Sequence, residues 1–168
     1  NFMALNNRGI VYNQLGEINL SLSDYNAAID ANPDFLPTYG NRAFLYKEIG
    51  EYDKAIKDYG TMISKNIFSV YAFFNRGLAY FESSEYELAI QDFTRVIFLE
   101  EIAAVADLYY APSAWNYRGF SYVQQGDYEP AIADFEHILE YFPNIEDEER
   151  DCLKDNLELL ESNMVNPS

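Results

Sequence analysis

The sequence predicts an all-α protein made of stacked helical hairpins, and a repeat with a period of 34 residues is the first reason. The dipeptide Asn-Arg recurs at this spacing, with Arg8, Arg42 and Arg76, and Tyr117-Arg118 follows after 42 residues. Each Arg is followed by a Tyr after four residues and by an Asp after sixteen: Tyr12, Tyr46, Tyr80, Tyr122, Asp24, Asp58, Asp92 and Asp134. A fixed period of this length indicates repeated supersecondary units rather than one globular core.

The second reason is the helical spacing of apolar residues within the repeats. In the segment 85–100 these residues form one continuous stripe, which consists of Tyr86, Ala89, Ile90, Phe93, Val96 and Ile97. The segment 70–81 is apolar over much of its surface and must be covered on more than one side. A single hairpin cannot bury such faces, so we expect neighbouring hairpins to cover them.

Small residues in the expected first helices indicate close helix crossings. Glycine in the middle of a helix costs about 1 kcal/mol relative to alanine. Gly9, Gly77 and Gly119 are therefore explained if a partner helix approaches too closely for a Cβ atom. The expected partners are aromatic rings of the second helices, namely Tyr25, Phe93 and Phe135. Pro130 falls in the first turn of a second helix, where its missing N–H costs little.

The period and these residues resemble the tetratricopeptide repeat, in which two antiparallel helices form each 34-residue unit. Gly16, Gly50 and Gly126 mark turns between helices, and Pro33 and Pro143 close their units. The resemblance covers residues 2–143 and implies an α-solenoid, a right-handed superhelix of four repeats at about 2–35, 36–69, 70–111 and 112–143. The chain departs from the family pattern at four places: Ser21 for Ala, Ser84 for the turn Gly, and Ile67 and Glu101 for Pro.

Eight extra residues precede the fourth repeat, within the segment 101–110. A helical stripe continues through Phe98, Ile102, Val105 and Tyr109. We therefore expect the second helix of the third repeat to be prolonged by about two turns, with Pro112 opening the next repeat. The alternative is an additional contact ridge that presents Tyr109 and Tyr110.

The segment 144–164 is expected to be a C-terminal capping helix. Its apolar residues share one face: Leu153, Leu157, Leu160 and Met164. Acidic residues in its first turn suit a helix N-terminus. The first repeat has no such cover, so we expect Phe2 and Ile10 to be partly exposed. This is consistent with missing upstream repeats or with a surface for self-association.

Each recurring Arg is expected to pair with the Asp in the second helix of its own repeat. The predicted structural pairs are Arg8–Asp24, Arg42–Asp58, Arg76–Asp92 and Arg118–Asp134. The alternative is a strip of four Arg that binds an anion, but the matched spacing favours pairing. An exposed pair contributes about 0–1 kcal/mol, whereas breaking a buried pair costs about 3–5 kcal/mol.

The Asn before each Arg lies about 100° away around the helix and cannot face the same neighbour. First helices line a concave groove in tetratricopeptide arrays, so the resemblance implies that Asn7, Asn41 and Asn75 project into it. Their amides suit the backbone of an extended peptide, and a comparable asparagine ladder lines the repeats of the O-GlcNAc transferase family. The alternative is a solvated or locally bonded amide. The same groove is expected to present Asn6, Phe44, Tyr71, Phe74, Phe81, Asn116, Tyr117 and Phe120.

Composition excludes several classes of partner. A net charge of −17 with only eleven Lys and Arg disfavours nucleic acid and anionic membranes. No run approaches the ~18–20 apolar residues of a membrane span. Cys152 is the single cysteine, which excludes an internal disulfide without identifying a compartment. No signal peptide is visible, so we favour the cytoplasm over export. The chain starts with Asn almost directly on a helix, and we expect it to be a fragment or a processed form.

The sequence offers few residues that could serve catalysis or cofactor binding. We expect the single histidine, His137, to be structural and solvent-facing, and Cys152 to pack in the capping helix as a small hydrophobe. No metal-ligand spacing and no phosphate-binding glycine loop occurs. The leading interpretation is a non-catalytic scaffold, without cofactor or metal, that holds a peptide or protein segment in the groove. The alternatives are a self-association element that uses the open first repeat, and a substrate-docking arm of a larger enzyme.

Overall fold

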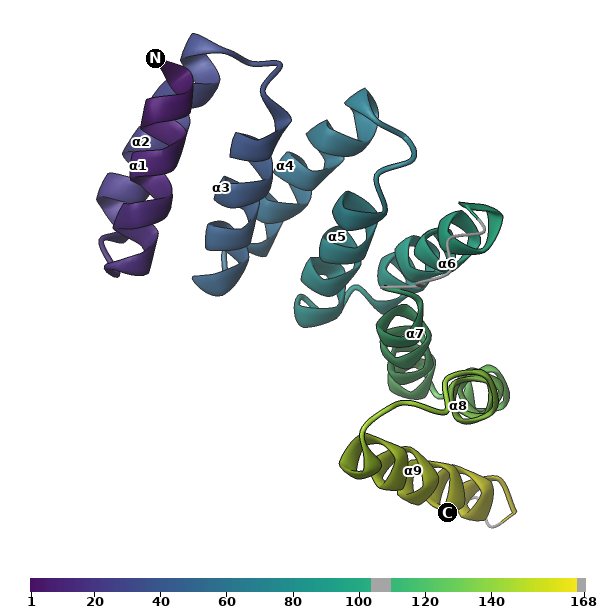
Figure 1. Cartoon of the computed structure of the whole chain (residues 1–168). Coiled ribbons are helices and arrows are strands. Elements are labelled where there is room, and N and C mark those ends of the chain that lie inside the picture. The colour runs from purple at the N-terminus through teal and green to yellow at the C-terminus, as the bar shows by residue number, and fades with distance from the viewer. Residues whose placement is uncertain (104–109, 166–168) are drawn as a thin grey trace. The chain divides into compact units, whose positions relative to one another are not determined.

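Helices make up all the regular structure in the computed structural model, which describes residues 1–103 and 110–165 (Figure 1). In chain order they are α1 (Phe2–Gln14), α2 (Ile18–Ala31), α3 (Leu36–Glu48), α4 (Tyr52–Lys65), α5 (Val70–Glu82), α6 (Tyr86–Ala103), α7 (Ala111–Gln125), α8 (Tyr128–Tyr141) and α9 (Asp147–Val165). The predicted all-α class is confirmed.

The helices belong to two compact units, Asn1–Ser83 and Ser84–Ser168. In the first unit, α1 packs on α2 and α3 packs on α4, while α3 also contacts α1, α2 and α5. In the second unit, α7 packs between α6 and α8, and α9 packs on α8. This order of paired helices is that of four hairpins followed by a capping helix, as predicted.

The turns inside the hairpins share one backbone conformation. Gly16, Gly50 and Gly126 have φ angles of 76°, 76° and 82°, in the left-handed region that glycine adopts without strain. Ser84, which replaces glycine in the third repeat, has a φ of 66° and so keeps the same turn. For a residue with a Cβ this conformation costs about 1–2 kcal/mol.

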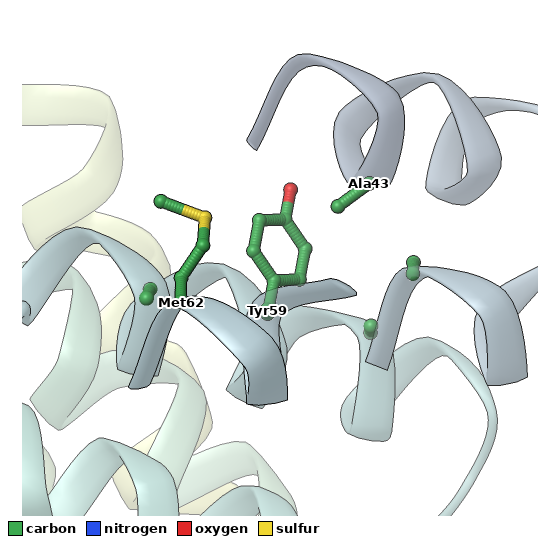
Figure 2. Close-up of a cluster of buried hydrophobic side chains, with 6 residues drawn as sticks. Ala43, Tyr59 and Met62 are labelled. Carbon is green, nitrogen blue, oxygen red and sulfur yellow. The ribbon is translucent and has the colours of Figure 1, made fainter. Parts of the chain in front are cut away.

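Large rings opposite small residues build the core of the first unit. Figure 2 shows the ring of Tyr59 on α4 directed towards Ala43 of α3, with Met62 beside it. Tyr59 and Ala43 are completely buried, and the cluster continues through Ala72 and Ala79 of α5. An aromatic side chain that fills the space left by alanines buries a large apolar area at each helix contact.

The capping helix completes the core of the second unit. Leu153 and Leu160 of α9 are buried in the same cluster as Phe135 of α8. Leu157 packs against this cluster from a partly buried position, whereas Met164 is exposed. The predicted capping role of this helix is confirmed, and its apolar face ends before Met164.

The glycines of α1 and α7 lie where a ring of the partner helix approaches the backbone closely. A Cβ on Gly9 would lie 2.7 Å from Cε1 of Tyr25, and a Cβ on Gly119 would lie 2.6 Å from Cε1 of Phe135. Both distances are far below van der Waals contact, so the predicted ring partners are confirmed for these two repeats. In the third predicted pair, Gly77 belongs to the first unit and Phe93 to the second, so this contact stays a prediction.

The connection before the fourth hairpin begins with a longer second helix. Helix α6 has 18 residues, whereas α4 and α8 have 14 each, so α6 is longer by about one turn. Val105 and Tyr109, which we expected to continue the helical stripe, lie outside the described residues.

A buried carboxylate of α6 holds the start of α7. Oε1 of Glu100 accepts a hydrogen bond from the backbone N–H of Tyr110 at 2.9 Å, and Oε2 accepts one from Ala111 at 2.6 Å. The first N–H groups of a helix have no partner inside it, and a negative charge at this end is favourable. Glu100 therefore does the work of a capping residue from a neighbouring helix, and nothing in the sequence pattern indicates this role.

The glycine contacts predict opposite effects for two alanine substitutions. Gly119→Ala should lower the free energy of unfolding by about 1–3 kcal/mol, because the new Cβ collides with the buried ring of Phe135. Gly60→Ala in α4 is the matched control, since its Cβ would lie 3.7 Å from the nearest side-chain atom. It should raise the same free energy by up to about 1 kcal/mol. Urea unfolding followed by circular dichroism measures both, and two stabilised variants would contradict the close contact.

Candidate functional site

The recurring Arg and Asp side chains meet in bidentate ion pairs. In the second hairpin, Nε and Nη2 of Arg42 each lie 2.7 Å from a carboxylate oxygen of Asp58. The corresponding distances from Arg118 to Asp134 are 2.8 and 2.7 Å. Two parallel, charge-assisted hydrogen bonds fix the geometry of such a pair as well as adding energy.

The first hairpin has the same ion pair in a more exposed position. Nε and Nη2 of Arg8 lie 2.6 and 2.8 Å from the carboxylate oxygens of Asp24. The Arg8 side chain is 59% exposed, against 17% for Arg42. The fourth predicted pair, Arg76 and Asp92, has its members in different units and stays a prediction.

The third nitrogen of the guanidinium reaches the preceding hairpin. Nη1 of Arg42 donates to Oδ1 of Asn26 at 2.5 Å, and Nη1 of Arg118 donates to Oγ1 of Thr94 at 3.0 Å. Each of these Arg side chains thus joins the two helices of its own hairpin and a helix of the one before it. Because three nitrogens of each guanidinium are already hydrogen-bonded within the protein, a structural role for these Arg side chains is favoured over an anion-binding strip.

The two outer ion pairs differ in their electrostatics. The hydrogen bond from Arg8 lowers the pKa of Asp24, and this effect outweighs the burial of the carboxyl, which raises it. Burial raises the pKa of Asp134 by more than the hydrogen bond and the charge of Arg118 lower it. The Arg118–Asp134 pair therefore stands in the drier environment, where removing one partner is most costly.

Asparagine amides connect the first helices of neighbouring hairpins in the first unit. Nδ2 of Asn41 donates to Oδ1 of Asn6 at 2.9 Å, and Nδ2 of Asn6 donates to Oδ1 of Asn7 at 3.3 Å. In α5, Nδ2 of Asn75 donates to the carbonyl oxygen of Tyr71 at 2.9 Å. Each amide offers two donors and an acceptor, so one local bond leaves further capacity. Asn6, which we expected on the groove face, is buried, and its amide bonds to Asn41 and Asn7.

Aromatic side chains lie on the same helices as these amides, and the cation beside them, Lys47, is paired with an acidic residue. Phe44 is 42% and Tyr71 38% exposed, and Phe74 and Phe81 are half-buried. Nζ of Lys47 lies 5.8 Å from the Phe44 ring centroid and 3.3 Å from Oε1 of Glu82. Burial lowers the pKa of Lys47, but Glu82 and Glu48 together raise it further, so the cation is kept and neutralised by its neighbours.

These side chains of α1, α3 and α5 form what we call the amide–aromatic surface of the first unit. Its residues are Asn7, Asn41, Phe44, Tyr71, Phe74, Asn75 and Phe81. A hollow of about 390 Å³ opens beside two of them, and it is lined by Leu36, Pro37, Gly40, Asn41, Met62, Asn66, Ser69 and Tyr71. The sequence pattern did not predict this hollow.

The three predicted groove residues of the second unit take part in packing. Phe120 lies edge-on to Phe135 with ring centroids 5.2 Å apart, and Tyr117 stacks on Phe93 at 5.7 Å. Oδ1 of Asn116 is buried and has no hydrogen-bond partner among the described residues. Each of the three is half-buried, and their contact with a ligand stays a prediction.

The structure corrects both expectations about reactive side chains. His137 is half-buried rather than solvent-facing, because its ring stacks between Trp115 at 4.0 Å and Tyr141 at 4.5 Å. Cys152 is exposed rather than packed. The inward position of α9 belongs to Leu153, and one residue turns the helix by about 100°.

Two further properties bear on the kind of site that this chain carries. Within residues 1–103 and 110–165, His, Cys, Asp and Glu do not gather in threes where they could hold a metal ion. No helix within these ranges combines the length and the apolarity that crossing a membrane requires.

Comparison with protein families identifies the repeats. Models of the tetratricopeptide repeat match residues 4–35, 24–57, 42–101 and 112–145. No curated protein matches the sequence significantly.

Solved structures of MamA proteins share the fold. One crystal structure of MamA has a TM-score of 0.76 at 20% identity and covers 96% of this chain and 88% of that chain. MamA from Desulfovibrio magneticus RS-1 has a TM-score of 0.75 at 16% identity, with 87% and 78% covered. MamA from AMB-1 has a TM-score of 0.73 at 19% identity, with 88% and 76% covered. At these identities the likeness concerns the fold alone.

The buried ion pair predicts a stability effect that is independent of any ligand. Arg42→Ala and Asp58→Ala should each lower the free energy of unfolding by about 3–5 kcal/mol, because each leaves a buried charge unpaired. Thermal unfolding measures the loss, and Lys57→Ala on the exposed side of α4 is the control. Melting temperatures equal to that of the unsubstituted chain would contradict the structural role.

Proposed function

Because the chain belongs to the tetratricopeptide repeat family, we propose that it is a non-catalytic scaffold that binds an extended segment of a protein partner. The proposed site is the amide–aromatic surface of the first unit. Proteins with this repeat fold generally bind other proteins. The observation that carries the proposal is that asparagine amides with unused hydrogen-bond donors and acceptors lie on α3 and α5, the helices that also carry exposed aromatic rings.

The amides would hold the backbone of the bound segment. Asn41 and Asn75 each use one N–H in a local bond, and the second N–H and the amide oxygen can pair with a peptide group. An extended peptide presents such groups on both sides. Regularly placed amides therefore favour a peptide over a compact small molecule.

The rings would supply most of the binding energy. Phe44 and Tyr71 are partly exposed, and covering an aromatic side chain removes a large apolar area from water. Micromolar binding, which corresponds to about −8 kcal/mol, is within reach of a few such contacts. Asn116, Tyr117 and Phe120 of α7 are proposed, separately, as the ligand contacts of the second unit.

Charge restricts the bound segment to neutral or basic sequences. The chain has a net charge of −17, which repels acidic partners. Lys47, whose ammonium lies over the ring of Phe44, is paired with Glu82. A carboxylate of the ligand that approached Lys47 would compete with Glu82 for it.

A peptide selected on the intact chain tests the site. A segment obtained by display of random peptides is measured by calorimetry against Phe44→Ala and Asn75→Ala, and each substitution should weaken binding at least about tenfold. Lys57→Ala, on the exposed side of α4, should bind as the unsubstituted chain does. Circular dichroism controls for folding. Unchanged affinity in both surface variants would reject the amide–aromatic surface as the site.

Self-association through α1 is a second candidate function, favoured by a comparison of equivalent positions. Val11 is 51% exposed, whereas Leu45 and Ala79, which are 34 and 68 residues further on, are at most 1% exposed. Ala4 is likewise exposed, and its counterparts Thr38 and Ala72 are buried. The preceding hairpin covers this face in α3, so α1 presents a surface of the kind that a helix covers.

Val11→Asp tests this second candidate. If copies of the chain associate through α1, light scattering should show a dimer or larger species whose fraction rises with concentration. The charge should abolish it, because a carboxylate in an apolar interface is desolvated without a partner. Leu20→Asp, also at an exposed apolar position but on α2, is the control. A monomer at high concentration of the unsubstituted chain would refute self-association.

A further inference from the structure

We propose that the hollow beside Gly40 is an anchor pocket that takes one large, uncharged apolar side chain of the bound segment. This inference rests on the proposed function and adds a specificity for one residue of the ligand. The hollow belongs to the first unit alone and lies between the ends of α3, α4 and α5.

Gly40 differs from Gly9 and Gly119, which are also buried, in having no steric need for the missing side chain. A Cβ there would lie 3.4 Å from Sδ of Met62 and 3.4 Å from Cε1 of Tyr71, at the edge of ordinary contact. At Gly9 and Gly119 the same atom would overlap a buried ring. Glycine in the middle of α3 weakens that helix, and close helix packing does not require it.

Gly40 contributes bare backbone to the lining of the hollow. The residues 34 positions before and after Gly40 are Asn6 and Phe74. Asn6 is buried and Phe74 half-buried, so side chains occupy the corresponding places in the first and third hairpins. At the second hairpin, Met62 and Tyr71 approach the bare backbone of Gly40 instead, and the hollow opens beside them.

The walls of the hollow are apolar and adaptable. Leu36 and Pro37 begin α3, and Met62 and Tyr71 face Gly40 from α4 and α5. Met62 stands beside the buried Tyr59 on α4 (Figure 2), and its unbranched thioether adjusts to ligands of different shape. No Lys, Arg, Asp or Glu side chain is among the lining residues, so a charged group would enter without a partner.

The rim is polar and suits the peptide groups on either side of an anchor. It carries Asn41, Asn66 and Ser69. Oδ1 of Asn66 accepts from the N–H of Phe68 at 3.0 Å, which leaves its amide nitrogen as a donor. A volume of about 390 Å³ is at the lower end of the ~300–1,000 Å³ range of ligand pockets. It fits one side chain with adjoining backbone.

Methionine methyl groups report on the hollow directly. The chain has three methionines, and Met3 and Met164 are exposed on α1 and α9, whereas Met62 lines the hollow. In NMR spectra of the chain with ¹³C-labelled methionine methyls, N-acetyl-phenylalaninamide should shift the Met62 signal saturably and leave the other two unchanged. N-acetyl-alaninamide has the same amides, and should bind at least about tenfold more weakly.

Substitutions at Gly40 distinguish the effect of filling the hollow from an effect on folding. Gly40→Leu should abolish the Met62 shift, because its side chain extends into the volume that the probe needs. Gly40→Ala adds only a Cβ in contact with Met62 and Tyr71 and is the folding control. Tyr71→Ala removes a partly exposed side chain that lines the hollow, and the affinity for the probe should fall at least about tenfold. This variant provides a test if Gly40→Leu does not fold. An unmoved Met62 signal, or unchanged binding to a folded Gly40→Leu variant, overturns the pocket.

The selected peptide distinguishes the pocket from the proposed function. If its affinity falls in Asn75→Ala but not in Gly40→Leu, the amide–aromatic surface stands and the anchor pocket is refuted. If Met62 responds to the probe while no peptide can be selected, the pocket stands for this class of side chain and the peptide-binding function fails.

Discussion

In each unit, an aromatic ring of a second helix lies against a position where the first helix has glycine or alanine, and the remaining contacts follow from this close approach. Tyr25 lies against Gly9, Tyr59 against Ala43, and Phe135 against Gly119. With the helices this close, a guanidinium one residue before the small residue reaches the Asp of the second helix with two nitrogens. The Asn before that Arg is turned away, which places the amides on a different face of the first helix.

The contacts that could be predicted from the sequence are those inside one hairpin. Arg42 and Asp58 are separated by the same sixteen residues as Arg8 and Asp24, so repetition itself indicates that they meet. The same reasoning identified the rings opposite Gly9 and Gly119. Positions that recur in several copies can be told apart from substitutions that occur in one copy only, and that is why the fold class was predictable.

Features that occur once were not predictable in the same way. Glu100 caps a helix that begins eleven residues later, and no other repeat repeats this contact among the described residues. The walls of the hollow at Gly40 come from three helices. Cys152 and His137 were misjudged because one residue of helical rotation decides whether a side chain faces solvent or a neighbouring ring.

The contact between Glu100 and the first N–H groups of α7 has an evolutionary consequence. The Glu100 carboxylate ties the start of α7 directly to α6. Alignment of the fourth hairpin on α6 can then survive insertions, deletions and changes of composition in the connection.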